Sequence, residues 1–332
     1  MRSILLLAAF FFVAISLVKA QSSASQQDET EAMSVEVVQL FKASRFAEAK
    51  EKAKQVISIR ESRLGKKHLG LVSAWRNLAY IEVALKDLDG AETAFDRTLD
   101  LLESNQPLTS ANELILAEIL EAAAYFDIGN RTLGKSEARL RRSLEIRERL
   151  EGDRSKRLAG PLRTLGQLHH GRGEYDKAVP FLTRALDLKY ESAGTLLDED
   201  LTLRETAICS LRKVDRTSEA DEIGRRFRSS TVGGPGIPKD GTISGGVVNG
   251  KALELARPAY PREARANNDS GTVSVKVLIN EAGKVVFACA VSGPKTLQMT
   301  SENAAYQSKF SPTRLKGEPV KVSGVITYNF KL

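Results

Sequence analysis

The sequence predicts a two-part protein, in which an all-α array of helical repeats precedes a small α+β module. Three observations predict this fold class. Small residues recur in one local pattern about every 42 residues through the first two thirds of the chain. Gly and Pro are then too dense for a helix or strand over residues 229–244, and alternating apolar runs follow as far as Leu332. The 332 residues suffice for two domains with separate cores.

The composition is typical of a globular protein, with 42% hydrophobic and 27% charged residues and a formal net charge of +7. This mild excess of positive charge fits a solvated mixed-charge surface, or an acidic or membrane-proximal partner. The two cysteines, Cys209 and Cys289, fall in different predicted domains. A disulfide framework needs more cysteines at closer spacing, so we expect each to be a buried small side chain.

Residues 1–20 have the pattern of a secretory signal peptide. Arg2 precedes an uncharged run over residues 3–18, and Val18 and Ala20 supply the small residues before a cleavage site. The run is short for a bilayer span, which needs about 20 apolar residues. We therefore expect an exported protein, with an uncleaved membrane anchor as the alternative. Residues 21–30, rich in Ser and Gln, predict a disordered lead-in.

Helical repeats are predicted over residues 31–228. A small residue ends the first marker in each of five repeats, and a second, apolar marker follows in the same register in the first four. Two markers in one register are strong evidence for a repeat array. Each repeat predicts a helix pair. In the fourth repeat the helices cover about residues 158–170 and 175–190, with a turn at Gly171-Arg172-Gly173. The small marker residues are Ala49, Ala91, Ser136, Ala178 and Ala220.

These repeats resemble tetratricopeptide repeats, and their length resembles the kinesin light chain type. The matching residues in the second repeat include Trp75, Leu78, Ala91 and Phe95. The resemblance implies a superhelix whose concave face is lined by the first helix of each pair. That face would bind an extended peptide or an acidic segment, or the array would serve only as a scaffold or spacer. The implied groove residues are Arg76, Tyr80, Arg163, Gln167 and His170.

Residues 229–244 predict a flexible joint, and residues 245–332 predict the α+β module. Pro261 opens a short helix over about residues 262–267. Strands over residues 271–280 and 284–292 flank a hairpin turn at Glu281-Ala282-Gly283. Leu297, Ala304, Ala305 and Phe310 indicate a helix packed on the sheet, and a last alternating run ends the chain.

This module resembles the C-terminal domain of TonB, the energy transducer of bacterial outer-membrane uptake, over about residues 246–332. The resemblance is carried by Tyr260-Pro261, Glu281-Ala282-Gly283-Lys284-Val285, Phe310-Ser311-Pro312 and Gly317-Glu318-Pro319-Val320. It implies a domain without catalysis that binds a short receptor segment by adding it to an edge strand of its sheet. The implied contacts are Arg257, where the family commonly has Gln, Tyr260, Pro261, Val322, Ser323, Gly324, Val325, Ile326, Thr327 and Tyr328.

Two departures from energy-transducing relatives shape the functional hypothesis. Those relatives keep a membrane helix bearing a His, and a Pro-rich spacer, whereas this apolar run has no His and repeats replace the spacer. We expect a periplasmic, non-enzymatic adaptor that docks extended peptides, such as segments of outer-membrane transporters, by strand addition, while the repeats bind a second partner. The alternatives are a membrane-anchored energy transducer and a structural or oligomerising scaffold.

The sequence predicts no catalytic residue, metal or cofactor. The three histidines are His68, His169 and His170, and adjacent side chains on a helix point about 100° apart. Cys289 has no His within its module to act as a base. There is no Gly-rich phosphate loop, and nucleic acid is an unexpected partner for an exported protein.

Overall fold

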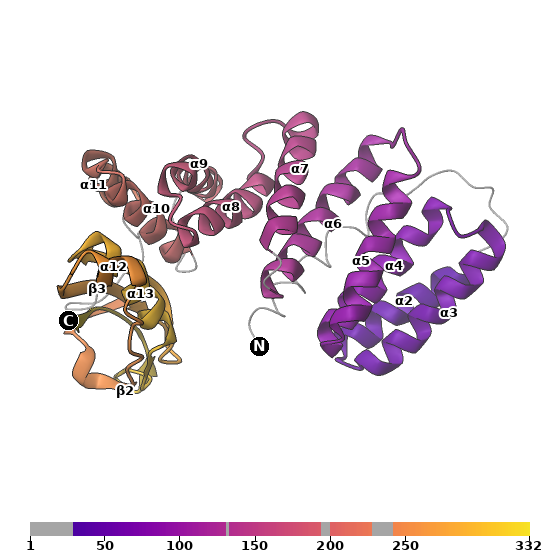
Figure 1. Cartoon of the computed structure of the whole chain (residues 1–332). Coiled ribbons are helices and arrows are strands. Elements are labelled where there is room, and N and C mark those ends of the chain that lie inside the picture. The colour runs from indigo at the N-terminus through magenta and orange to yellow at the C-terminus, as the bar shows by residue number, and fades with distance from the viewer. Residues whose placement is uncertain (1–28, 131–132, 194–199, 228–241) are drawn as a thin grey trace. The chain divides into compact units, whose positions relative to one another are not determined.

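The computed structural model describes residues 29–130, 133–193, 200–227 and 242–332 (Figure 1). The predicted signal peptide, most of the lead-in and residues 229–241 of the predicted joint lie outside these ranges. The chain forms two compact units, Met1–Pro161 and Leu162–Leu332. The second unit therefore contains the last helix pairs together with the C-terminal module. Within the described ranges, none of the helices combines enough length and apolarity to cross a membrane.

The first unit consists of paired antiparallel helices, as the repeat pattern predicts. Polar side chains cap two of them: Asp87 accepts a hydrogen bond from the Gly90 amide and Thr109 accepts one from the Asn112 amide. The described helices are α2 (Glu29–Lys42), α3 (Phe46–Leu64), α4 (Val72–Leu85), α5 (Leu88–Glu103), α6 (Ser110–Gly129) and α7 (Leu133–Glu151), with a 3₁₀ turn at Leu69–Leu71 and another at Lys156–Leu158.

The second unit continues the same pattern. Its helices are α8 (Ala159–Gly171), which begins in the first unit, α9 (Tyr175–Ala193), α10 (Leu201–Lys213) and α11 (Thr217–Arg226). The five marker residues of the repeats all lie on second helices and are all buried. At Gly166 an added Cβ would lie 2.5 Å from Cγ of Leu182, so this glycine allows the close approach of α8 and α9.

The C-terminal module contains a four-stranded sheet in the order β1-β8-β3-β4, and its two long hairpin strands lie where the sequence predicts them. Phe310 differs from its expected place, because it lies in β5 instead of the helix, although its side chain is buried in the same core. The elements are β1 (Thr242–Val247), β2 (Ala252–Glu254), α12 (Arg262–Ala266), β3 (Gly271–Ile279), β4 (Val285–Ser292), α13 (Lys295–Gln307), β5 (Lys309–Phe310), β6 (Arg314–Leu315), β7 (Glu318–Pro319) and β8 (Lys321–Phe330), with a 3₁₀ turn at Asn249–Lys251.

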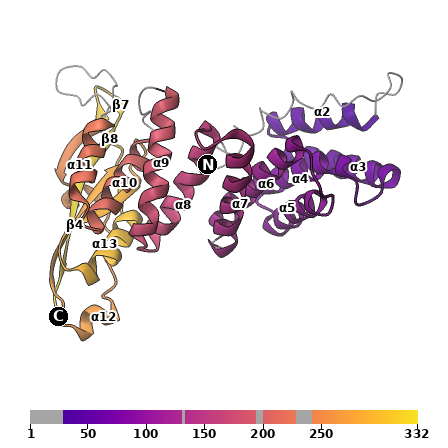
Figure 2. The ribbon, with the colours of Figure 1, turned by 90° about the horizontal axis from the view of Figure 1, so that it is seen from above.

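Helices cover both faces of this sheet, and Figure 2 shows α13 and α10 beside β4. Val273, Val275 and Val277 point into the core that α13 closes. On the opposite face, Leu278 and Phe287 form a smaller apolar cluster with side chains of α10. The period of two along a strand explains how one sheet contributes to two cores.

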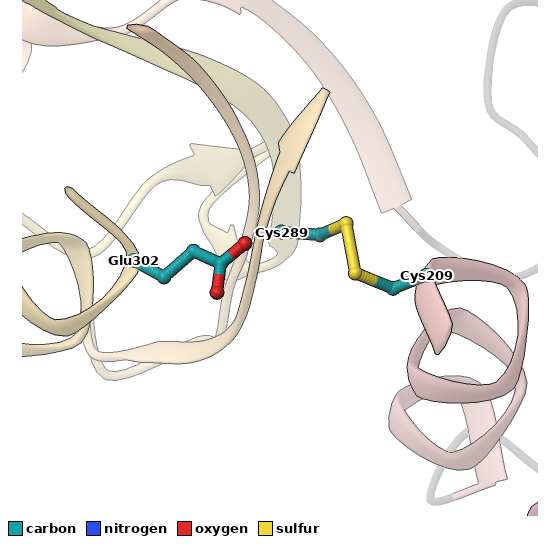
Figure 3. A group of neighbouring side chains, drawn as sticks. All are labelled: Cys209, Cys289 and Glu302. Atoms are coloured by element: carbon teal, nitrogen blue, oxygen red, sulfur yellow. A yellow bond between two sulfur atoms is a disulfide. The ribbon is translucent and has the colours of Figure 1, made fainter. Parts of the chain in front are cut away.

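The expectation of two unpaired cysteines is wrong. Cys209 of α10 and Cys289 of β4 are both buried, as expected, but they form a disulfide that links residues 80 positions apart (Figure 3). The disulfide forms because α10 packs against the sheet and brings the two side chains together. Spacing along the sequence carries no information about this contact.

The first strand of the sheet begins inside the stretch that composition predicts as a joint. Thr242 to Ser244 are the first three residues of β1, which pairs in parallel with β8. Backbone pairing to a neighbouring strand stabilises this segment, although its two glycines have low strand propensity.

Candidate functional site

The seven predicted docking residues of the last run lie together on β8, and their side chains alternate as expected. Val322, Gly324, Ile326 and Tyr328 are buried toward the core of the module. Ser323, Val325 and Thr327 are half-buried on the opposite face. The backbone of β8 is therefore the feature that these residues share.

β8 is an inner strand over half its length, which corrects the expectation that it forms an edge of the sheet. On one side β3 pairs antiparallel with β8, from Ile279 opposite Val322 to Gly271 opposite Phe330. On the other side β1 pairs in parallel with residues 321–325. The physical reason is that β1, at the start of the module, pairs with β8 and satisfies backbone groups that would otherwise face solvent.

Asn249 continues the pairing with β8 beyond the end of β1. Its side-chain amide donates to the carbonyl oxygen of Thr327 at 2.7 Å and accepts from the amide of Thr327 at 2.8 Å. The side chain therefore pairs with Thr327 much as the backbone of an added strand residue would. Asn249 is not among the residues predicted for this site, because an Asn next to a glycine indicates only a turn.

The far end of β8 is more open. Backbone groups of a strand point to alternate sides, so Asn329 directs its amide and carbonyl to the same side as Val325 and Thr327. β1 ends opposite Val325, and Asn329 is exposed. A hollow of about 440 Å³ at this end of the sheet is lined by residues of β3 and β8, including Gly271, Thr272 and Asn329, and so lies toward β3. An added strand can begin to pair at Asn329.

One of the residues predicted before the helix, Tyr260, reaches the same end of β8. The ring of Tyr260 contacts that of Phe330 edge-on, with centroids 5.5 Å apart, and its hydroxyl donates to the carbonyl oxygen of Asp269. Pro261 precedes α12 as expected, and Arg257 is exposed. Tyr260 therefore supports the end of the docking strand from the core side.

The opposite edge of the sheet, at β4, has an internal partner. The amide of Ala290 donates to the carboxylate of Glu302 in α13 at 2.7 Å, and Lys213 of α10 pairs with the same carboxylate at 2.8 Å. All three residues lie away from solvent. This edge is therefore less available to an added strand than the open end of β8.

Cys209, Cys289 and Glu302 lie close enough together to be considered as metal ligands (Figure 3). Metal binding by cysteine uses the thiolate. Both sulfur atoms are joined in the disulfide, so neither is a thiolate. The group acts as a covalent and ionic link between α10, β4 and α13.

A second polar contact joins α10 to the sheet on the same face as the disulfide. Glu205 pairs with Lys276 of β3 at 2.7 Å and with Arg204 at 2.9 Å. Burial raises the pKa of Glu205, but Lys276 and Arg204 outweigh it, so the pKa is lower than usual. The Glu205 carboxylate is therefore held in its charged form between α10 and the sheet.

Two of the predicted groove residues face the C-terminal module. Gln167 and His170 of α8 line a pocket of about 310 Å³ whose other wall includes Ala288 and Met299. Burial, together with the charge of Lys213, lowers the pKa of His170 to about 4, so its imidazole is neutral at pH 7. Arg163, the third predicted residue of this helix, is half-buried.

The remaining predicted groove residues lie on α4 in the first unit. Arg76 is half-buried, and its guanidinium lies 3.9 Å from the carboxylate of Glu118 in α6. Tyr80 is only 4% exposed and packs edge-on against Phe95. Tyr80 is therefore a core residue here, and we remove it from the residues proposed to contact a partner.

Comparison with known families matches two segments of the chain. Residues 256–332 match the Gram-negative bacterial TonB protein C-terminal family, and residues 116–191 match the tetratricopeptide repeat family. Both families are protein-interaction domains. The described residues thus form an all-α tetratricopeptide-like array followed by a small α+β domain of the TonB C-terminal type. No curated protein matches the sequence.

Among solved structures, BtubC (BKLC) from P. vanneervenii is 21% identical, with a TM-score of 0.49 over 59% of this chain and 77% of that chain. The nearly identical TPR-like repeats of a putative kinesin light chain from Podosopora anserina are 15% identical, with a TM-score of 0.48 over 60% and 95%. The apo form of RapI is 14% identical, with a TM-score of 0.50 over 60% and 52%. At these identities the likeness concerns the fold alone.

Proposed function

We propose that this protein is a non-enzymatic adaptor of the bacterial periplasm. Its C-terminal domain docks an extended peptide, such as a segment of an outer-membrane transporter, by adding it to the side of β8 that faces β1. Its tetratricopeptide-like repeats bind a second partner. The match of residues 256–332 to the TonB C-terminal family supports the transporter as the class of partner.

The pairing of β1 with β8 is the observation that carries the docking proposal. On this side β8 already pairs in parallel with a strand, with one shift of register between Ser244 and Gly246, and the Val248 amide directly after β1 donates to the Val325 carbonyl at 2.9 Å. Backbone bonds of this kind provide affinity for an extended peptide of varied sequence. The open end at Asn329 provides the first available pairing position.

The disulfide supports the periplasmic part of the proposal. Disulfides persist in oxidising compartments such as the periplasm and are rare in the cytosol. Cys209 and Cys289 are joined and buried, so this bond belongs to the core of the second unit. A protein with such a bond benefits from folding after export.

In the repeats, three of the predicted groove residues remain accessible to a second partner. Arg76 in the first unit, and Arg163 and Gln167 in the second, keep part of their side chains accessible. His170 remains among the residues proposed to contact this partner, because it lines the pocket beside α13. Arg side chains fit an acidic or carboxylate-bearing partner segment.

The experiment uses the full chain as bait for envelope proteins and compares two substitutions at one position. Asn329→Pro removes the outward amide of β8, whereas Asn329→Ala removes only the side chain. We expect Asn329→Pro to lose at least tenfold of the captured transporter and Asn329→Ala to keep it. Equal capture by both folded variants would contradict strand addition at this side of β8.

A second candidate function is a structural cap on the repeat array. It is favoured by the apolar cluster of Leu201, Leu278 and Phe287 around the disulfide, which attaches the sheet to the last helix pair. Terminal repeats of a solenoid need their exposed face covered. Under this alternative, substitutions at Asn329 and Thr327, whose backbone groups face the docking side of β8, would leave partner binding unchanged.

A further inference from the structure

We propose that β1 is an exchangeable internal strand, which occupies the docking side of β8 until a partner peptide displaces it in the same parallel register. This inference rests on the proposed function, because it describes how the proposed docking site is regulated. It also defines the chemistry of the peptide that fits. Four features of the described residues carry it.

The first feature is that β1 pairs in the way an incoming peptide would. Five residue pairs connect β1 to β8, from Thr242 opposite Lys321 to Val247 opposite Val325. Asn249 then continues the pairing to Thr327 through its side chain. A peptide cannot pair with residues 321–327 of β8 while this segment is in place.

The second feature is that few side chains of β1 are buried, since Thr242 at its start is the one fully buried residue. Two consecutive glycines, Gly245 and Gly246, provide no side chains, and the register shifts between Ser244 and Gly246. Val247 is 63% exposed. Glycine in a strand loses more conformational entropy on ordering than other residues do, so such a strand is intrinsically weak. A peptide with ordinary strand residues at positions other than that of Gly245 can therefore compete with it.

The third feature is a buried position that fits one aliphatic side chain. Val248 is 1% exposed, and an added Cβ on Gly324 would lie 2.6 Å from its Cγ1. The absence of a side chain at Gly324 thus creates the space that Val248 fills. The partner peptide is expected to carry a β-branched or similar aliphatic residue at this point, preceded by small residues where Gly245 approaches Val322.

The fourth feature is the open position from which displacement can begin. Asn329 lies on the docking side beyond Asn249, and Thr272 donates a hydrogen bond to its side chain at 2.6 Å. A parallel peptide two residues longer than the native segment would pair with Asn329 as well. It could then replace Asn249 and β1 in succession, so that the backbone groups of β8 are never all unpaired at once.

The test uses a fluorescent synthetic peptide with the sequence of residues 242–249 and measures its binding to the full chain by anisotropy. The intact chain should bind it weakly, because the tethered native strand competes at a high effective concentration. Asn249→Ala removes the contact to Thr327, and Gly245→Val introduces a Cβ 2.7 Å from Cγ1 of Val322 and 3.0 Å from that of Val248. We expect each to bind the peptide at least tenfold more tightly than the intact chain.

Gly250→Val is the matched control, because an added Cβ at Gly250 meets nothing within 4 Å. It should bind the peptide as weakly as the intact chain. A second arm joins β1 to β8 through Ser244→Cys and Ser323→Cys, which are paired residues. The oxidised form should not bind the peptide, and reduction should restore binding to the level of the intact chain treated with the same reductant.

Two outcomes would overturn the exchange of β1. One is a folded Asn249→Ala or Gly245→Val chain that binds no more tightly than the Gly250→Val chain, and the other is an oxidised, cross-linked chain that binds as well as the intact one. Failure of the proposed function is distinguishable. In that case the peptide exchanges with β1 as expected, but capture of envelope proteins is indifferent to Asn329→Pro.

Discussion

Gly283 carries the turn between β3 and β4, and two constraints act on it. Its φ of +76° favours glycine, and an added Cβ would lie 1.9 Å from the carbonyl oxygen of Phe310. Its own carbonyl oxygen accepts a hydrogen bond from the Phe310 amide at 2.9 Å. The turn was predictable from Glu281-Ala282-Gly283, whereas the contact with Phe310, distant in sequence, was not.

A substitution at Gly283 tests this contact. Gly317→Ala serves as the control, because Gly317 has a φ of +90° with nothing within 4 Å of an added Cβ. The control should cost about 1 kcal/mol of unfolding free energy for backbone strain. Gly283→Ala should cost about 1–3 kcal/mol more, because a backbone atom must move. Urea denaturation measures both, and equal midpoints would show that the turn relaxes without loss.

His170 makes the stability of the second unit depend on pH. Its Nδ1 lies 2.8 Å from Oγ of Ser210, Lys213 of α10 is nearby, and the ring contacts that of Tyr175 in α9. Ser210 already donates to the carbonyl oxygen of Thr206, so the imidazole donates to Ser210. Its pKa falls from 6.5 to about 4 because burial and Lys213 oppose the charged form.

The sign of the effect follows from proton binding. Between pH 6.5 and 4 the unfolded chain binds this proton and the folded chain does not, so stability falls as the pH falls through that window. The loss is at most about 3 kcal/mol. His170→Gln should flatten this part of the curve when unfolding free energies at pH 7.5 and pH 4.5 are compared. Parallel curves for the two proteins would exclude His170 as the cause.

At the scale of elements, α10 is the link between the repeats and the sheet of the second unit. The disulfide between Cys209 and Cys289 and the ion pair of Glu205 with Lys276 both start from it. The repeat period predicts α10 itself, because its residues follow the same pattern as the earlier helices. The partner of α10 was not predictable, because a period describes contacts between neighbours only.

Removing the disulfide measures the strength of that link. The double substitution Cys209→Ala with Cys289→Ala removes a cross-link between residues 80 positions apart. It should lower the unfolding free energy of the second unit by about 2–4 kcal/mol. The intact chain in reductant should unfold at the same urea concentration as the double variant. A double variant as stable as the oxidised intact chain would mean that packing and the ion pair of Lys276 suffice.

β1 shows why a docking strand can be predicted and its occupant missed. The alternation of Val322, Gly324, Ile326 and Tyr328 is visible in the sequence and is confirmed by their burial. Residues 242–247 contain two glycines and follow a Gly- and Pro-rich stretch, so local propensity favours a joint. Only the parallel pairing with β8, across some 80 residues of chain, reveals the strand.

For the whole molecule, periodicity and family resemblance were enough to predict the fold class and the order of its parts. They were not enough to predict the packing within the second unit, where helices α8 and α10 of the array border the C-terminal module. Tyr80 illustrates the same limit, since a position on the first helix predicts a face but not its burial. Contacts between distant segments decide which predicted surfaces stay accessible.

Amide hydrogen exchange tests the central claim most directly. It is measured on the full chain alone and with a saturating concentration of the docking peptide from the transporter that the full chain captures. Strand addition with exchange predicts that amides of β1, and that of Val248 directly after it, lose protection when the peptide binds. The amides of Val325 and Thr327 in β8 should stay protected, and that of Asn329 should gain protection. Bound peptide with unchanged protection in both β1 and β8 would contradict the account.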